Sequence, residues 1–261
     1  MPPVPVPDAD GIAAVTRPRL RAAGRPLPTR EALVPSTALT YTDPLPRLIT
    51  LPGVYRPQAD TRMLLDALAR EPLRPGAEVV EIGTGTGALA LRAAARGADV
   101  TAVDVAWPAV LAARLNSWRQ SLRLRVLHGD FAARTRGRRF DLVLANPPYV
   151  PCPDAAVPTS GSRRAWDAGR DGRAVIDRIC AAAPGLLRPG GVLLMVHSGM
   201  CGAQETLALL ARHGLTAQVT ERTWVPWGPV LRSRRAWLQG QGLAEDGAEQ
   251  EELVVVRARA T

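Results

Sequence analysis

The sequence predicts an α/β fold with a mainly parallel, seven-stranded sheet and an antiparallel strand at its C-terminal edge. Two observations predict this class. Short apolar runs alternate with segments of helical periodicity between residues 61 and 212, which is typical of a parallel sheet covered by helices on both faces. After residue 215 the alternation stops, because two strand-like runs follow each other with no strongly periodic helix between them. An antiparallel pair that closes the sheet edge is the simplest arrangement for these two runs.

The individual elements follow from apolar periodicity and from turn residues. The first helix is expected to begin at Asp60 or Thr61, either of which can cap it, and to end before Pro72. The predicted strands cover residues 78–82, 99–103, 124–127, 141–145, 191–196, 216–223 and 252–257. The predicted helices between them cover residues 88–96, 108–118 and 204–212, and a further helix, capped by Asp171, contains residues 175–183. Residues 224–250 are expected to be a loop in which Trp224, Trp227 and Trp237 pack beneath the chain or form a lip over a substrate crevice.

Composition divides the chain into two parts. Residues 1–50 are rich in Pro and Arg, so they are expected to form a weakly ordered arm with at most a short helix around residues 12–15. Residues 51–261 are expected to form one domain, since 261 residues are enough for a single core plus an extension. Aromatic residues make up only 4% of the chain, so Ala, Val and Leu must supply most of that core.

Charge and cysteine content exclude several classes of protein. The net charge is +9, yet none of the 33 basic residues is Lys, which excludes Schiff-base chemistry and the lysine of a Walker-type phosphate loop. No apolar run approaches the ~20 residues of a membrane span, and the N-terminus lacks the apolar core of a secretory signal. Cys152, Cys180 and Cys201 are too widely spaced for a disulfide framework or a metal knuckle. We therefore expect a cytoplasmic protein with no metal site and no membrane contact.

A glycine-rich turn between the first strand and its helix marks a ligand loop. Gly83, Gly85 and Gly87, with Thr84 between the first two, form a tight turn in which the backbone can approach a ligand closely at the positive end of a helix. Gly83, Gly85 and Ala88 also satisfy the dinucleotide pattern G-x-G-x-x-G/A, so the turn by itself is ambiguous. Asp104, at the end of the second strand, stands where an acidic residue holds ribose hydroxyls in either case.

Three features favour S-adenosylmethionine over NAD as the ligand. Gly87 makes the loop G-x-G-x-G rather than the dinucleotide form. Glu81 places a carboxylate beside the ligand, which suits a cationic amino-acid moiety and not a pyrophosphate. Asp130 follows the third strand, where it can bind the exocyclic amine of adenine. These acidic residues at successive strand ends predict a cofactor site.

The tetrapeptide Asn146-Pro147-Pro148-Tyr149 follows the fourth strand and therefore faces the same crevice as the glycine loop. Its chemistry suits a planar NH2 group, whose nitrogen lone pair is delocalised. The Asn146 side-chain oxygen and the Pro147 carbonyl can accept the two N–H hydrogens, while the prolines hold these acceptors in place. Tyr149 can stack on the flat substrate group. The tetrapeptide predicts methyl transfer to an amide or amine nitrogen, in which orientation replaces a strong base.

These motifs resemble class I S-adenosylmethionine-dependent methyltransferases, and in particular the HemK family of protein-(glutamine-N5) methyltransferases. Residues 55–65 (YRPQADTRMLL) and 166–173 (WDAGRDGR) resemble segments of its compact eukaryotic and archaeal branch, and the similarity covers residues 51–257. The resemblance implies a Rossmann-like fold, and as substrate a protein that presents a glutamine, such as a translation termination factor. Ala168 departs from the branch pattern, and the Pro-rich arm cannot form the N-terminal helical domain of bacterial members.

The resemblance also implies a role for each motif residue. Gly83, Gly85 and Gly87 would line the methionine end of the cofactor, Asp104 would hold the ribose, and Asp130 would bind the adenine. Asp60 or Thr61 would border the cofactor pocket. Asn146, Pro147, Pro148 and Tyr149 would bind and orient the substrate amide.

Two other functions remain open from the sequence. An adenine-N6 methyltransferase of DNA or RNA uses the same tetrapeptide, and arginine clusters at residues 134–139 and 232–235 favour it, although no separate target-recognition domain is present. A non-catalytic S-adenosylmethionine-binding partner subunit is the other alternative, but such a subunit has no need of an intact Asn-Pro-Pro-Tyr. Whether an activator subunit is required is not predicted.

Overall fold

The computed structural model describes residues 47–261, so the arm predicted for residues 1–50, with its helix near residues 12–15, lies outside the described residues except for residues 47–50. Seven strands and eight α-helices follow. The strands are β1 (Glu78–Ile82), β2 (Asp99–Asp104), β3 (Leu124–His128), β4 (Phe140–Ala145), β5 (Leu187–Ser198), β6 (Leu215–Pro226) and β7 (Gln250–Ala260). The helices are α1 (Ala59–Arg70), α2 (Ala88–Ala95), α3 (Trp107–Arg119), α4 (Phe131–Arg134), α5 (Ala174–Leu186), α6 (Ala203–Arg212), α7 (Pro229–Ser233) and α8 (Arg235–Gly240).

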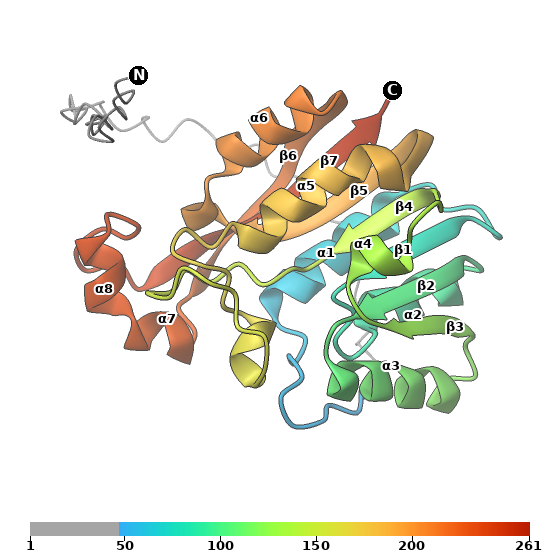
Figure 1. Cartoon of the computed structure of the whole chain (residues 1–261), viewed down its shortest axis with the longest axis horizontal. Coiled ribbons are helices and arrows are strands. Elements are labelled where there is room, and N and C mark those ends of the chain that lie inside the picture. Colours follow the sequence, from blue (N-terminus) through green and yellow to red (C-terminus); the bar gives the residue numbers. More distant parts are fainter. Residues whose placement is uncertain (1–46) are drawn as a thin grey trace, which may run out of the picture. The chain divides into compact units, whose positions relative to one another are not determined.

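The strands form one sheet in the order β3-β2-β1-β4-β5-β7-β6 (Figure 1). Strands β1 to β5 are parallel, whereas β7 is antiparallel to both β5 and β6. The predicted fold class is confirmed, including the antiparallel pair at the C-terminal edge. The strand order reverses between β1 and β4, where Ile82 lies beside Ala145. Ligands of open α/β sheets bind at such a reversal, outside the carboxyl ends of the strands.

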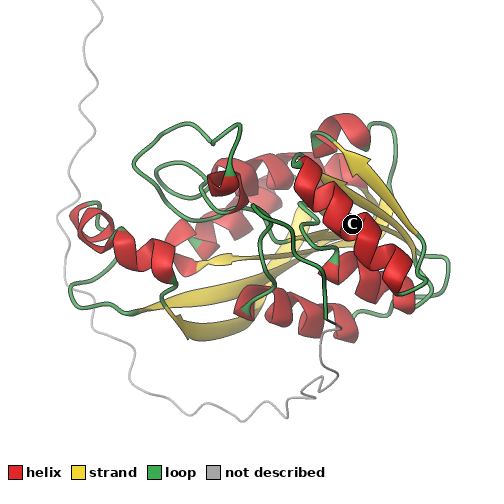
Figure 2. Cartoon of the chain, turned by 90° about the horizontal axis from the view of Figure 1, so that it is seen from below, coloured by secondary structure: helices red, strands yellow, loops and turns green. Residues whose placement is uncertain are grey.

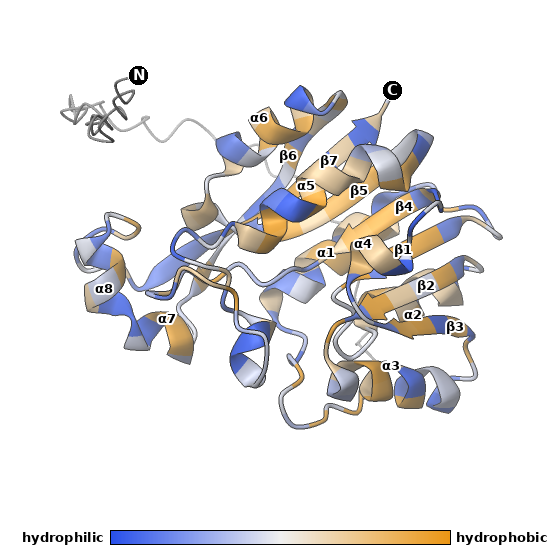
Figure 3. Ribbon diagram, in the orientation of Figure 1, coloured by the Kyte–Doolittle hydropathy of each residue, from blue (hydrophilic) through white to orange (hydrophobic). Residues whose placement is uncertain are grey.

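Helices cover both faces of the sheet (Figure 2). Helices α1, α2 and α3 pack on one face, and α4, α5 and α6 pack on the other. The central strands are apolar along most of their length (Figure 3), as expected for strands that are buried on both faces. Aliphatic side chains supply nearly all of this core, among them Leu64 and Leu68 of α1, which are fully buried. Each such leucine contributes roughly 1.5–3 kcal/mol through burial, which holds α1 against the sheet.

Two predicted helix caps are wrong. Helix α1 begins one residue before Asp60, and its N-cap is Gln58, because the Asp60 side chain turns into the interior and accepts hydrogen bonds from Tyr55 and Asn146 instead. Helix α5 begins at Ala174 with Arg173 as its N-cap. Asp171 lies before that cap and accepts a hydrogen bond from the Arg173 backbone N–H, so it closes a turn rather than the helix.

The segment between β6 and β7, expected to be a loop, contains the short helices α7 and α8. Trp227, Leu231 and Leu238 form a second, smaller core there, against which Val150 and Met200 pack. Trp227 is only 2% exposed, so it packs as expected beneath this segment, whereas Trp224 is 64% exposed. The insertion therefore contacts the chain directly after the tetrapeptide. Across residues 47–261 we find no helix that is long and apolar enough to cross a membrane.

Candidate active site

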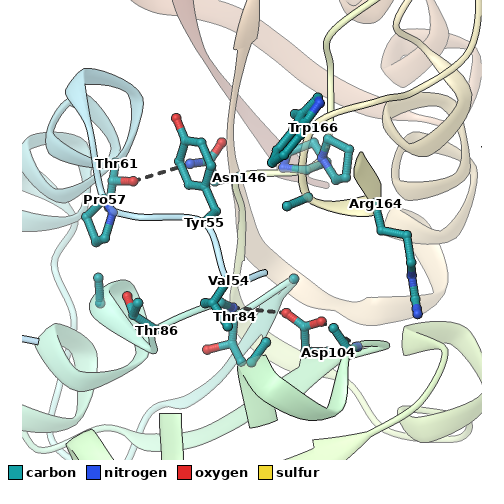
Figure 4. A pocket seen from close by; sticks show the side chains of 18 of the residues that line it. Val54, Tyr55, Pro57, Thr61, Thr84, Thr86, Asp104, Asn146, Arg164 and Trp166 are labelled. Carbon is teal, nitrogen blue, oxygen red and sulfur yellow. Dashed lines mark hydrogen bonds between the residues drawn. The ribbon is translucent and has the colours of Figure 1, made fainter. Parts of the chain in front are cut away.

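A cavity that is partly open to solvent lies at the carboxyl ends of β1, β2 and β4 (Figure 4). It brings together most of the predicted site residues from four separate segments of the chain. They are Asp60 and Thr61 from α1, Glu81, Gly83, Thr84 and Gly85 from the glycine turn, Asp104 from β2, and Asn146, Pro147, Pro148 and Tyr149 after β4. Gly87 and Asp130 are not among the residues that line it.

The glycine turn takes a backbone conformation that favours glycine. Gly83, Gly85 and Gly87 have φ angles of 70°, 52° and 83°, which L side chains rarely adopt. Gly83 and Gly85 line the cavity, and a Cβ at either position would lie 3.9 Å from a backbone oxygen, that of Asn146 or Tyr55 respectively, so a ligand meets their backbones directly. Gly87 precedes α2, and a Cβ at this position would lie 3.3 Å from the Ala113 Cβ of α3. Gly87 therefore allows α2 and α3 to pack closely, and does not line the cavity.

Glu81 places a buried carboxyl group against the cavity. The residue is only 3% exposed. Its Oε2 accepts hydrogen bonds from the Thr84 hydroxyl (2.6 Å) and from the Ala90 backbone N–H (3.0 Å). Burial raises the pKa of Glu81 to about 8, although these two hydrogen bonds act in the opposite direction. A cationic ligand group beside Glu81 would favour the ionised form.

Asp104 lies at the end of β2, on the other side of the glycine turn. It accepts hydrogen bonds from the backbone N–H groups of Gly85 (3.0 Å) and Ala106 (2.8 Å). Burial raises the pKa of Asp104, while the hydrogen bonds and the nearby Arg164 lower it. Arg164 belongs to the loop after the tetrapeptide and donates a hydrogen bond to the Val105 carbonyl (3.0 Å). This bond ties that loop to the end of β2, over the cavity.

The tetrapeptide is joined to the start of α1 by hydrogen bonds. The Asn146 Nδ2 donates to Asp60 Oδ2 (3.1 Å) and to Thr61 Oγ1 (3.4 Å), and the second bond is visible in Figure 4. The Tyr149 hydroxyl donates to the same Asp60 oxygen (3.2 Å). Burial, followed by the charge of Asp60, raises the pKa of Tyr149 well above its usual value, so its hydroxyl stays protonated. The amide of Asn146 and the ring of Tyr149 are therefore held against α1.

A loop behind the tetrapeptide fixes its backbone. The Val150 N–H donates to the Trp166 carbonyl (2.7 Å), and the Ala168 N–H donates to the Val150 carbonyl (3.1 Å). A Cβ at Gly172 would lie only 2.3 Å from the Tyr149 carbonyl oxygen, so the two backbones meet there without room for a side chain.

Asp167 links this loop to the insertion between β6 and β7. Its carboxylate is fully buried and forms ion pairs with Arg163 (2.7 Å) and with Arg234 at the junction of α7 and α8 (2.6 Å). Arg234 also donates to the Pro151 carbonyl (2.9 Å). The insertion is thus anchored two residues beyond Tyr149.

Asp130 lies elsewhere in the fold. It caps α4 by accepting hydrogen bonds from the Ala132 and Ala133 N–H groups, and it pairs with Arg178 at 2.5 Å. Partial burial tends to raise its pKa, but Arg178 and the helix amides lower it overall. Its role toward adenine stays a prediction.

Sequence reasoning did not assign Tyr55, Arg164 and Trp166 to the cavity, which all three line. The segments that contain Tyr55 and Trp166 carry the family resemblance, which is the sequence signal that could have assigned these two residues to the cavity. Within residues 47–261 no group of three or more His, Cys, Asp or Glu side chains could hold a metal ion.

The donor set of the cavity fits S-adenosylmethionine. Glu81 supplies a buried carboxyl for an ammonium group, the backbone of Gly83 and Gly85 lines the cavity without side chains and allows close approach of the amino-acid end, and Asp104 supplies a carboxylate for hydroxyl groups. A pyrophosphate would place negative charge beside two carboxyl groups. The arrangement therefore favours the cofactor that the sequence predicts.

Comparisons with known proteins agree with this chemistry. A family model described as methyltransferase small domain matches residues 46–157. A protein of Methanocaldococcus jannaschii assigned as a protein N5-glutamine methyltransferase is 32% identical over 181 residues, which cover 69% of this chain and 90% of that protein. The release factor glutamine methyltransferase of Bordetella pertussis is 38% identical over 173 residues, and this chain spans only 63% of its length.

Solved structures show the same fold. The T. thermophilus 16S rRNA N2 G1207 methyltransferase RsmC, determined with AdoMet and guanosine, is 25% identical with a TM-score of 0.54, over 81% of this chain and 46% of that chain. Mtq2 from the E. cuniculi Mtq2–Trm112 complex is 22% identical with a TM-score of 0.51, over 80% of this chain and 99% of that chain. These structures show the fold, and the archaeal relative, which is matched over 90% of its length, confirms the family resemblance found in the sequence. The chain belongs to the HemK family of S-adenosylmethionine-dependent protein glutamine-N5 methyltransferases.

Proposed function

We propose that residues 51–261 transfer a methyl group from S-adenosylmethionine to the side-chain amide nitrogen of a glutamine in a translation release factor. The observation that carries this proposal is that Asn146 and the glycine turn line one cavity. A planar amide bound at Asn146 would therefore lie beside a cofactor bound at the turn. The names of the relatives support a glutamine of a release factor as the acceptor. Release factors act with ribosomes, so the site of action would be the cytoplasm.

Each site residue has a distinct part in this proposal. When bound, the cofactor supplies an electrophilic methyl group on its sulfonium. Glu81 would hold the ammonium group, the Gly83–Gly85 backbone would contact the amino-acid end, and Asp104 would accept hydrogen bonds from the ribose. Thr84 holds the Glu81 carboxyl through its hydroxyl.

The tetrapeptide orients the acceptor. The Asn146 Oδ1 and the Pro147 carbonyl accept the two N–H hydrogens of the glutamine amide, which aims the nitrogen lone pair toward the cofactor. These hydrogen bonds strengthen as positive charge develops on nitrogen, so they stabilise the transition state more than the ground state. The nitrogen would bond to the methyl carbon as the methyl–sulfur bond breaks, which leaves S-adenosylhomocysteine, and the methylated nitrogen would then lose one proton to water. Tyr149 provides an apolar ring face against the flat amide.

Methyl transfer to defined acceptors tests this function. Purified protein is incubated with methyl-labelled S-adenosylmethionine and peptides that contain Gly-Gly-Gln, with Gly-Gly-Asn and Gly-Gly-Glu peptides as matched controls. We expect label in the Gly-Gly-Gln peptide and in a whole release factor, and mass spectrometry should place one methyl group on the glutamine. Label in adenine-containing RNA or DNA, with none in the peptides, would replace this proposal with the nucleic-acid alternative.

Four arginines of the two clusters give little support to a nucleic-acid substrate. Arg138 and Arg139 precede β4 and so lie at the end of the sheet opposite the cavity, where Arg138 pairs with Glu78 and Arg139 binds backbone carbonyls. In the second cluster, Arg234 pairs with buried Asp167 and Arg235 pairs with Glu249. These arginines stabilise the fold and do not line the cavity.

The need for a second subunit is a separate question. Mtq2 was solved in a complex with Trm112, a complex described as responsible for methylation of a termination factor. We propose two assays. The first uses the chain expressed and purified alone, and the second uses the chain purified from its own host together with the proteins that bind to it there. Activity of the chain alone shows that no activator is needed, whereas activity only in the co-purified form shows that one is.

A further inference from the structure

We propose that Asp60 is a positioning residue that sets which way the amide of Asn146 faces, so that the Asn146 oxygen, not its NH2 group, is presented to the substrate. This inference deepens the proposed function and rests on it, because it takes the Asn146 oxygen as the acceptor for the substrate nitrogen.

Asp60 is a buried carboxylate with five donors around it. The residue is 2% exposed. Its Oδ1 accepts from the Thr61 backbone N–H (2.6 Å) and from the Thr61 hydroxyl (3.2 Å). Its Oδ2 accepts from the hydroxyl groups of Tyr55 (2.9 Å) and Tyr149 (3.2 Å) and from the Asn146 Nδ2 (3.1 Å). Through these hydrogen bonds, the Asp60 carboxylate connects α1, the segment before it and the tetrapeptide.

Tyr55 and Tyr149 both donate hydrogen bonds to Asp60 Oδ2. Burial, followed by the charge of Asp60, raises the pKa values of both Tyr55 and Tyr149 far above the usual value for a phenol. Both hydroxyl groups therefore keep their hydrogens and point them at Asp60 Oδ2. With five donors directed at its two oxygens, Asp60 serves as an acceptor toward Asn146.

The amide of Asn146 has two faces of opposite character, and Asp60 discriminates between them. An amide has an oxygen that only accepts and an NH2 group that only donates. With Nδ2 toward Asp60, one hydrogen goes to the Asp60 carboxylate and the other to Thr61 Oγ1. The Thr61 hydroxyl can accept it because its own hydrogen is given to Asp60 Oδ1.

The flipped orientation of the Asn146 amide is disfavoured both by Asp60 and by Thr61. It would bring the Asn146 oxygen to about the same 3.1 Å from a carboxylate oxygen, where two acceptors face each other without a hydrogen between them. It would also leave Thr61 Oγ1 without its donor. Asp60 and Thr61 therefore consume both hydrogens of Nδ2 and leave Oδ1 free for the substrate. In Figure 4 the Asn146 nitrogen faces Thr61, and the carbonyl oxygen is on the opposite side.

Asp60→Asn is the decisive variant. It keeps the size of the side chain, but it removes the preference of the carboxylate for the NH2 group of Asn146 over its oxygen. The new amide can pair with either orientation of Asn146, so part of the population would present NH2 to the substrate. Asp66→Asn, on the same helix but outside the cavity lining, is the matched control for loss of one charge. We expect kcat to fall about 10²-fold in Asp60→Asn, with less than about a threefold change in the affinity for S-adenosylmethionine, and no change in Asp66→Asn.

A second readout follows the amide itself. In ¹⁵N-labelled protein, the side-chain NH2 signals of Asn146 are assigned by their loss in Asn146→Ala. In the wild type, both hydrogens should be protected from exchange, and in Asp60→Asn they should lose that protection. This measurement needs no substrate, so it tests Asp60 even if no glutamine peptide is methylated. In that case the rate comparison is made on whichever acceptor is labelled.

Thr61 provides an independent pair if Asp60→Asn does not fold. Thr61→Val removes the second acceptor and should lower kcat about tenfold, the worth of one such hydrogen bond, while Thr61→Ser, which restores the hydroxyl, should recover most of the lost rate. The proposal is overturned if Asp60→Asn keeps the wild-type kcat, or if kcat falls while the Asn146 signals stay as protected as in the wild type. Equal rates for Thr61→Val and Thr61→Ser would overturn it as well.

Discussion

The buried carboxyl of Glu81 makes cofactor binding depend on pH, and Glu81→Gln should remove that dependence. The pKa of Glu81 is raised to about 8 by burial, so at pH 7 most of the ligand-free protein has a neutral Glu81. An ammonium group binds best to the ionised form. At pH 7, one pH unit below that pKa, ionising Glu81 costs about a factor of ten in affinity, on the order of 1 kcal/mol. At pH 6 the cost is about twice as large.

The assay is calorimetric titration with S-adenosylhomocysteine, which shares the amino-acid end of the cofactor and is chemically stable. The wild-type affinity should rise about tenfold from pH 6 to pH 7 and should level off near pH 8, where the amino group of the ligand begins to lose its own proton. In Glu81→Gln the affinity should be nearly constant between pH 6 and pH 7. A wild-type affinity that changes less than twofold over this interval, or a variant that follows the wild type, refutes the assignment of Glu81 to the ammonium group.

Three further outcomes are expected. Asn146→Ala should lower kcat by about 10²- to 10³-fold while calorimetry shows nearly unchanged cofactor binding; wild-type turnover would show that Asn146 does not orient the substrate. Arg234→Ala leaves fully buried Asp167 with Arg163 as its remaining ion-pair partner within residues 47–261, so urea denaturation should show a loss of about 3 kcal/mol, and a loss below 1 kcal/mol would contradict the ion pair described above. The folded-state pKa of Glu81 lies above its unfolded value of 4.5, so its contribution to stability is complete below pH 4.5 and is lost as the pH rises toward 8; the ligand-free wild type should therefore lose more thermal stability over this range than Glu81→Gln does.

The strands and their positions could be predicted because buried parallel strands have a continuous apolar pattern. Residues 78–82 and 141–145 are predicted almost to the residue, and the end of each then places a functional loop. Helices α7 and α8 could not be predicted, because they contain only five and six residues and are stabilised by Trp227 and Leu238 in the second core, not by local periodicity.

The parts of the site that are continuous in sequence could be predicted, whereas the parts that depend on contacts between distant residues could not. The glycine turn and the tetrapeptide are continuous in sequence, so their types and spacing are sufficient. Asp60 looks like a helix cap until Asn146 and Tyr149, 86 and 89 residues away, are seen to donate to it. Asp130 stands at the expected strand end but is engaged by Arg178, which no local pattern reveals.

The close backbone contact between Gly172 and Tyr149 restricts how this loop can change in length during evolution. Residues 153–156, 159 and 160 are exposed and precede both Gly161, which lines the cavity, and Arg163, which pairs with buried Asp167, so extra residues there displace mainly solvent. From Trp166 onward the loop is bonded to Val150, and at Gly172 there is no room even for a methyl group. Insertions, deletions and fused tags should therefore be tolerated in the first half of the loop. In the second half, a change of a single residue should shift the tetrapeptide itself.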